Sequence, residues 1–299
     1  MGFKYINPGY ANLLDTDGGA TVEGNAYSRT GVSLWQPERS KGVALGETPA
    51  ELYGKFDAYL KSGSNLDSWA YIALGGFHGV SIHGYKNSWS VNGCLSGSIC
   101  FFDKAFVVPG AVNTIWFHVK PGSSGESVLR VLVNGHEIGN KTNAGINFGN
   151  WKDIGVCSDS EDALLSNLIF SDAPINPKEQ VVALPALSTE TDMAEMDGGK
   201  YMATAAGQEI LQSVDVSSLM EAYGEDSEVT GIALAGNPAY RTAEGLSSLT
   251  GISKSGDAVT EHGTHELKAD ASSGVVDSYA VSMKLSDLAG MQFGWKAGE

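Results

Sequence analysis

Residues 114–135 read TIWFHVKPGSSGESVLRVLVNG and carry the clearest structural signal in the chain. Two apolar runs, 115–119 and 128–133, flank a loop rich in Gly and Ser, so each run predicts a strand. The second run is almost continuously apolar, which is typical of a strand covered on both faces. It ends in Asn134-Gly135, the strongest two-residue hairpin signal, because both turn positions require a positive φ. The stretch therefore predicts two strands and a hairpin turn.

The sequence on either side extends this pattern over the first 175 residues. In 52–60, LYGKFDAYL, Leu52, Phe56 and Leu60 share one face of an expected strand with small residues, and polar and aromatic residues share the other. Further strands are expected, separated by Gly, Asn, Ser and Pro, at 31–35, 69–74, 80–83, 154–157 and 168–170. About ten short strands with turn signals between them indicate a β-sandwich or jelly roll.

Composition divides the chain near residue 175. The first 175 residues hold 21 of the 27 aromatic residues, with 12 basic and 16 acidic residues, whereas the rest holds 7 basic and 19 acidic residues. Residues 172–177, DAPINP, place two prolines within four residues, which ends the preceding strand. We therefore expect a jelly-roll domain at 1–175, a linker at 176–200 and an acidic β-rich second domain at 201–299.

The second part is expected to consist mainly of strands with one or two short helices. Residues 217–223 predict a helix, with Ser218 and Glu221 as a capping box and Gly224 as its stop. Residues 243–249 could form another helical turn. Strands are predicted at 200–205, 209–214, 229–235, 266–269 and 275–285.

The strands around the Gly/Ser loop also resemble a known family. A strand with Trp116 and His118, then a loop, then a strand ending in Asn-Gly is similar to concanavalin A-like jelly rolls, the laminin G and pentraxin superfamily. Residues 52–59 and 165–172 fit further strands, so the resemblance covers residues 25–175. It implies a mainly β chain, with an N-terminal concanavalin A-like jelly-roll sandwich followed by a smaller β-rich domain. The chain is also similar to two-domain bacterial surface or phage structural proteins carrying such a module, although residues 176–299 by themselves resemble no known family.

Charge and hydropathy exclude several classes of partner. The chain has 19 Lys and Arg against 35 Asp and Glu, a net charge of −16, which argues against binding nucleic acid or an anionic membrane surface. No stretch approaches the ~18 apolar residues that a membrane helix needs, so no insertion into a membrane is expected. Residues 1–8 lack the apolar run of a cleavable signal peptide. We expect an extracellular or virion location, with no cleavable signal peptide visible in the sequence.

The sequence offers no catalytic constellation. The Glu-x-Asp-x-x-Glu signature of β-glucanases in this superfamily is missing, and Glu51 and Asp57, six residues apart, are expected at the solvated surface. His118 is expected to hydrogen-bond inside or at the rim of the sandwich. His262 and His265, in an expected loop, could contact a metal, but no acid or Cys completes the set. We therefore expect no enzyme activity and no metal ligands.

Four aromatic residues crowd a region rich in Gly, Ser and Asn: Trp69, Tyr71, Tyr85 and Trp89. Aromatic faces stack on sugar rings, so these residues are the candidate glycan-binding site; the alternative is that they fill the sandwich core. Residues 15–19, DTDGG, resemble the start of a calcium loop, but Ala26 stands where a Glu is needed. No cofactor is expected, with calcium left open.

These observations lead to one expected function and two alternatives. The chain is expected to be a non-enzymatic structural or attachment protein of a phage virion or bacterial surface assembly, whose lectin-like domain recognises glycans. Its partners would be other subunits of a homo- or hetero-oligomer and a cell-surface glycan, because open sheet edges allow rings or filaments. The alternatives are a free-standing carbohydrate-binding protein and a polysaccharide-degrading enzyme.

Overall fold

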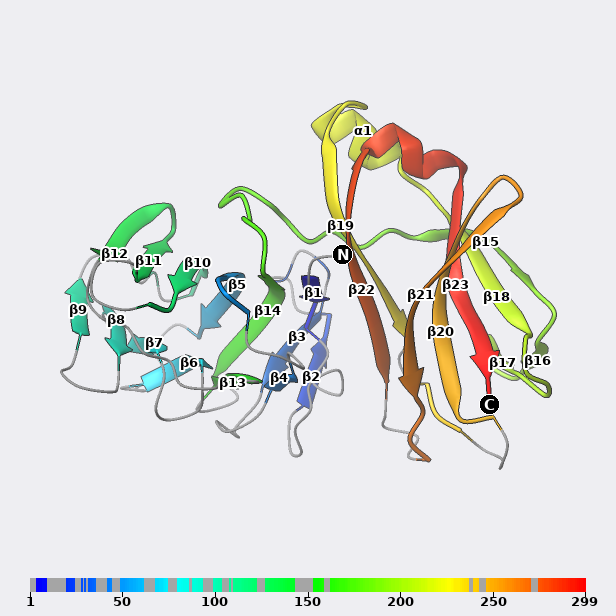
Figure 1. Cartoon of the computed structure of the whole chain (residues 1–299), viewed down its shortest axis with the longest axis horizontal. Coiled ribbons are helices and arrows are strands. Elements are labelled where there is room, and N and C mark those ends of the chain that lie inside the picture. The colour runs from blue at the N-terminus through cyan, green and yellow to red at the C-terminus, as the bar shows by residue number, and fades with distance from the viewer. Residues whose placement is uncertain are drawn as a thin grey trace. The chain divides into compact units, whose positions relative to one another are not determined.

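The computed structural model (Figure 1) describes residues 4–9, 20–24, 28, 30, 32–35, 42–44, 49–61, 68–74, 80–85, 88–93, 99–103, 108, 110–122, 127–142, 153–158, 162–236, 239–241, 246–269 and 274–299. In 20–23, 68–74, 80–85, 88–93 and 99–103 it describes the backbone and not the side chains. The chain divides into two units, Met1–Val182 and Ala183–Glu299.

The first unit contains two antiparallel sheets. The larger has the order β12-β11-β10-β5-β14-β3-β2, with β1 paired to β14. Its strands are β1 (Lys4–Asn7), β2 (Ala20–Glu23), β3 (Val32–Trp35), β5 (Leu52–Leu60), β10 (Val112–Lys120), β11 (Val128–Val133), β12 (His136–Thr142) and β14 (Ala163–Ser171). The smaller has the order β4-β13-β6-β7-β8-β9, with β4 (Gly42–Ala44), β6 (Ser68–Leu74), β7 (Val80–Tyr85), β8 (Ser88–Gly93), β9 (Ile99–Asp103) and β13 (Asp153–Ser158).

Alternation along β5 and β10 gives the larger sheet two different faces. Leu52, Phe56 and Leu60 are buried on one face, where the ring of Phe117 lies directly over Gly54. The opposite face, which we call the polar face, is built from three cross-strand pairs: Tyr53 with His118, Lys55 with Trp116, and Asp57 with Thr114. The side-chain period of two thus keeps the core and the polar face apart.

Three residues with positive φ, in two places, shape the polar face. Asn134 and Gly135, at φ 50° and 80°, form the turn between β11 and β12, which confirms the predicted hairpin. Asn167, at φ 54°, lies in a bulge of β14 between Ser166 and Ile169. A bulge re-aims a side chain relative to the regular ladder, and here it brings Asn167 to Asp57.

The second unit is built around a five-stranded sheet of order β15-β18-β23-β20-β21, beside the pairs β16-β17 and β19-β22. Val216, Leu285, Leu288 and Phe293 form its buried cluster. Its elements are β15 (Ala186–Thr191), β16 (Ala194–Met196), β17 (Lys200–Met202), β18 (Glu209–Val214), α1 (Ser217–Tyr223), β19 (Glu228–Gly236), β20 (Ser248–Ser255), β21 (Ala258–Glu266), β22 (Val275–Lys284), the 3-10 helix η3 (Leu285–Gly290) and β23 (Met291–Gly298).

The predicted fold class is confirmed: the chain is mainly β, with antiparallel sheets as in a β-sandwich and two short helices in the second unit. No helix of the described residues is long and apolar enough to cross a membrane.

Four local expectations for residues 176–299 need correction. Helix α1 has the predicted bounds, but Val216 is its N-cap, so the Ser218 hydroxyl lies too far into the helix to cap it, and the Asp215 carboxylate accepts the Ser217 N–H instead. Residues 176–200, expected to be a linker, contain β15 and β16, because 186–191 pair with β18. The strand expected at 266–269 ends at Glu266. Of the helical turn expected at 243–249, residues 243–245 lie outside the described residues, and Ser248 already begins β20.

Candidate functional site

A pocket of about 480 Å³ lies over the polar face of the first unit. Its floor is formed by Lys55 and Asp57 from β5, Thr114 from β10 and Asn167 from β14, and residues 177–181 form its roof. Three strands of one sheet therefore position polar groups in one small volume. Alternation turns Lys55, Asp57 and Thr114 away from the core, and the bulge of β14 brings Asn167 to them.

Asp57 is the fixed centre of the pocket floor. Its Oδ1 accepts a hydrogen bond of 2.7 Å from the Thr114 hydroxyl, and its Oδ2 accepts one of 2.8 Å from the Asn167 amide. Asp57 is 6% exposed, so the expectation that it lies at the solvated surface was wrong. The Asp57 carboxylate can be buried because each of its oxygens accepts a hydrogen bond. The hairpin residue Asn134 lines the same pocket, and its side-chain oxygen accepts the Thr114 N–H at 2.9 Å.

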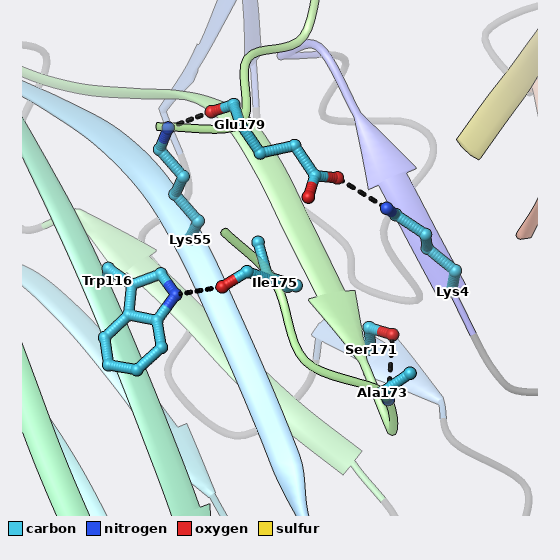
Figure 2. Close-up of polar contacts among 7 residues, drawn as sticks. All are labelled: Lys4, Lys55, Trp116, Ser171, Ala173, Ile175 and Glu179. Carbon is cyan, nitrogen blue, oxygen red and sulfur yellow. Dashed lines mark hydrogen bonds and ion pairs between the residues drawn. The ribbon is translucent and has the colours of Figure 1, made fainter. Parts of the chain in front are cut away.

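Residues 172–182, which we call the strap, follow β14 and run back over the polar face (Figure 2). The Trp116 indole donates a hydrogen bond of 2.8 Å to the Ile175 carbonyl, and Ile175 is 3% exposed. Trp116 is buried on the polar face beneath the strap. The strap therefore covers the middle of this face.

Glu179 ties the strap to two lysines (Figure 2). Its carboxylate pairs with Lys4 of β1 at 2.5 Å, and its backbone carbonyl accepts a hydrogen bond from Lys55 of β5. Lys4 and Lys55 are each 7% exposed. Sequence reasoning missed these three residues; the two prolines of the strap indicated only where a strand ends.

A second cluster, the rim cluster, lies on the polar face where β5 begins and β10 ends, and consists of Glu51, Tyr53, His118 and Lys120. The Tyr53 hydroxyl and His118 Nε2 both donate to Glu51 Oε2, at 2.9 and 2.8 Å. The rings of Tyr53 and His118 stack at 4.1 Å with an interplanar angle of 6°. His118 therefore hydrogen-bonds at the rim of the sheet, one of the two positions expected for it.

The hydrogen bonds of the rim cluster shift two pKa values in opposite directions. The hydrogen bond from Tyr53, with that from His118, lowers the pKa of Glu51. Burial, with the hydrogen bond to Glu51, raises the pKa of Tyr53 to about 12. Near neutral pH the cluster thus holds a carboxylate and a protonated phenol. Arg130 adds a cation beside it, 5.7 Å from the centre of the Trp116 ring.

The aromatic residues proposed from the sequence as the glycan site lie on three neighbouring strands of the smaller sheet. Trp69 and Tyr71 belong to β6, Tyr85 to β7 and Trp89 to β8, and the backbone register pairs Tyr71 with His83 and Trp89 with Gly84. Their side chains lie outside the described residues, so this site stays a prediction. Residues 15–19, the calcium-loop resemblance, also lie outside them.

In the second unit, His262 and His265 lie in β21 and not in the expected loop. The His262 ring stacks on Tyr279 at 3.7 Å, and its Nε2 meets the Ser253 hydroxyl at 2.8 Å. His265 Nε2 instead meets Asp277 Oδ1 at 3.2 Å. The two imidazoles thus serve separate partners. Within the described part of the chain, no group of three or more His, Cys, Asp or Glu residues could hold a metal ion.

We expect the second unit to lose stability on acidification because of His262. Burial lowers the pKa of His262, against a smaller opposing effect of Asp277. The folded state therefore binds fewer protons than the unfolded state, so stability is complete above the unfolded pKa of about 6.5 and falls as the pH drops toward the folded pKa. Urea unfolding between pH 7.5 and pH 5 should show this slope, and His262→Gln should flatten it. The exposed His136→Gln variant is the control; an equal slope in wild type and His262→Gln would refute the assignment.

No family model matches the chain, and no curated protein matches it. Solved structures do resemble it. An endo-β-1,4-glucuronan lyase from the fungus Trichoderma reesei is 13% identical with a TM-score of 0.45, covering 58% of this chain and 98% of that one. Sheep galectin-11 in complex with glycerol is 17% identical with a TM-score of 0.33, covering 42% and 92%.

The cellulose induced protein Cip1 is 12% identical with a TM-score of 0.39, covering 54% of this chain and 88% of that one. Because each of these identities is below 20% and each TM-score is below 0.5, what those proteins bind or cleave is not carried over to this chain.

Proposed function

We propose that the first unit recognises a glycan at its polar face. The observation that carries this proposal is the juxtaposition of the pocket, with its fixed carboxylate and amides, and the partly exposed aromatic rim cluster on the same strands. Saccharides present hydroxyls, which pair with carboxylate and amide groups, and apolar C–H faces, which pack on aromatic rings. The polar face offers both kinds of group side by side.

The finer part of the proposal is that the chain is a non-enzymatic attachment protein of a phage virion or bacterial surface assembly. It is supported by β15 and β21, the two edge strands of the five-stranded sheet in the second unit, each with one hydrogen-bonded neighbour in that sheet. An open edge allows a second copy or another subunit to extend the sheet. Size-exclusion chromatography with light scattering tests this part, and a monomer at high concentration would count against it.

Glycan binding should depend on Tyr53. We expect the wild-type chain to bind at least one glycan on a broad array, and Tyr53→Ala to weaken that binding roughly threefold to tenfold, because an aromatic contact contributes ~0.5–1.5 kcal/mol. Isothermal titration calorimetry with the best array hit measures this change. Tyr223→Ala, which truncates an exposed tyrosine of α1, is the matched control. Absence of binding across the array, or equal affinity of wild type and Tyr53→Ala, would contradict the proposal.

The contents of the rim cluster favour a second candidate, a polysaccharide lyase. In β-elimination a base removes the C5 proton of a uronate, the C4–O bond breaks, and an acid protonates the leaving oxygen. His118 could serve as the base and Tyr53, protonated near neutral pH, as the acid. Ultraviolet absorbance of the unsaturated product, followed on a panel of uronate polysaccharides, separates this candidate from simple binding. Wild-type activity lost in both His118→Ala and Tyr53→Phe would establish it.

A further inference from the structure

We infer that Lys4 and Lys55 form a carboxylate subsite on the polar face, and that Glu179 of the strap fills this subsite in place of an acidic glycan. This inference rests on the proposed glycan recognition and narrows its ligand to a uronate-containing chain. The strap is then a built-in competitor that an acidic glycan displaces.

Positive charge is concentrated at one buried place on the polar face. Lys4 and Lys55 are both almost fully buried, and an ammonium group withdrawn from water is costly unless it is paired. The register places them on the same face, since Lys4 pairs with Ser171 and Lys55 with Ile169, two residues apart in β14. The larger sheet thus sets one cation on each side of β14, where Glu179 reaches Lys4 with its carboxylate and Lys55 with its backbone carbonyl.

The strap presents to this place the groups that an acidic sugar would present (Figure 2). Glu179 supplies a carboxylate to Lys4 and a carbonyl oxygen to Lys55, and Ile175 supplies a carbonyl oxygen to the indole of Trp116. A uronate residue carries a carboxylate and several hydroxyl oxygens, so it could replace each acceptor in kind. The pocket floor around Asp57 directly adjoins this place.

Most of the strap is exposed to solvent. Ile175 is buried, but residues 172–174 and 176–178 around it are exposed. The turn at Asn176 is closed by its own bonds, from the Glu179 N–H to the Asn176 carbonyl and from the Lys178 N–H to the Asn176 side chain, both 2.9 Å. A segment with few buried apolar contacts opens at low free energy, so a ligand of the right charge can displace it.

The test compares trigalacturonate with its fully methyl-esterified form, which has the same ring skeleton without the charges. Glu179→Gln removes the competing carboxylate, so we expect it to bind trigalacturonate roughly tenfold or more tightly than wild type, the worth of one charge-assisted hydrogen bond. Affinity for the ester should not change. Asp162→Asn, which removes the carboxylate of a solvent-exposed pair with Lys61, is the matched control. Adding Lys55→Met to Glu179→Gln should abolish the gain.

A second measurement keeps the test decisive if Glu179→Gln folds poorly. In wild type, the Trp116 indole N–H resonance, assigned by comparison with Trp116→Phe, should shift on saturation with trigalacturonate, because the Ile175 carbonyl leaves it. Ile175→Ala, which loosens the strap without changing charge, should also bind more tightly. Unchanged trigalacturonate affinity in both strap variants, or an unmoved Trp116 resonance at saturation, overturns the inference.

The outcomes also separate this inference from the proposed function. If wild type binds neutral glycans and the strap variants bind trigalacturonate no better, the subsite is refuted while glycan recognition stands. If only the strap variants bind trigalacturonate, both are supported. If neither wild type nor any variant binds any glycan, both are overturned.

Discussion

Gly294→Ala is expected to unfold the second unit or to destabilise it by about 3 kcal/mol or more. A Cβ at residue 294 would lie 1.7 Å from the backbone oxygen of Ile210 and 3.0 Å from the Cα of Leu211. These are atoms of the backbone of β18, which pairs with β23 through Leu211 and Gly294. No side-chain rotation relieves such a clash, so β18 and β23 would have to separate at the centre of the five-stranded sheet.

Urea unfolding of the chain, followed by circular dichroism, measures this effect. Domains are stable by only ~5–15 kcal/mol, so a loss of this size is readily visible. Gly290→Ala is the matched control, because a Cβ there meets nothing within 4 Å and should change stability by less than about 0.5 kcal/mol. A Gly294→Ala variant as stable as Gly290→Ala would contradict the close approach of the two strands.

The second large effect is expected in the core of the first unit, where the Phe117 ring occupies the space that a side chain at Gly54 would fill. A Cβ at Gly54 would lie 2.0 Å from Cζ and 2.2 Å from Cε1 of the Phe117 ring. Phe117 is completely buried and packs on Phe170 at a centroid distance of 6.2 Å, so its ring cannot move away. We expect Gly54→Ala to cost about 3 kcal/mol and Phe117→Ala about 3–5 kcal/mol.

The specific prediction is that the two positions are coupled. Phe117→Leu removes the ring atoms nearest to Gly54. The Gly54→Ala/Phe117→Leu double variant should therefore lose ~0.5–3 kcal/mol less stability than the two single variants lose together. A double-mutant cycle measured by urea unfolding tests this. Val108→Ala, at a half-exposed site of the same unit, should be nearly neutral and serves as control. Strict additivity would show that the ring does not occupy the space above Gly54.

Elements with a strong local pattern could be predicted from the sequence. The alternation in residues 52–60 gave the bounds of β5, and Asn134-Gly135 gave the turn after β11, because a period of two and a positive φ are read within a few residues. Strands β20 and β23 were not predicted from the sequence, and neither was most of β21. They are rich in Gly, Ser and Thr, and Gly251 and Gly294 are required by close approaches of other elements rather than by their own strands.

The candidate site could not be predicted from the sequence, for a different reason. Lys4, Lys55 and Glu179 are separated by up to 175 residues, and only the pairing of β1, β14 and β5 brings them together. Asp57 looked like a surface acid because nothing near it in sequence indicates Thr114 and Asn167 as its donors. Hydropathy reports burial in a core; it does not report burial of a polar face beneath a later segment.

The strap has a mechanical consequence, because it is also the covalent path between the two units, which divide at Val182 and Ala183. A pulling force applied through the second unit enters the first through residue 182 and is borne first by Glu179 and its contacts with Lys4 and Lys55. Such a force would peel the strap from its C-terminal end before loading any strand of the sheet. Tension would therefore act on the polar face itself, and the cover that the strap gives this face would depend on load.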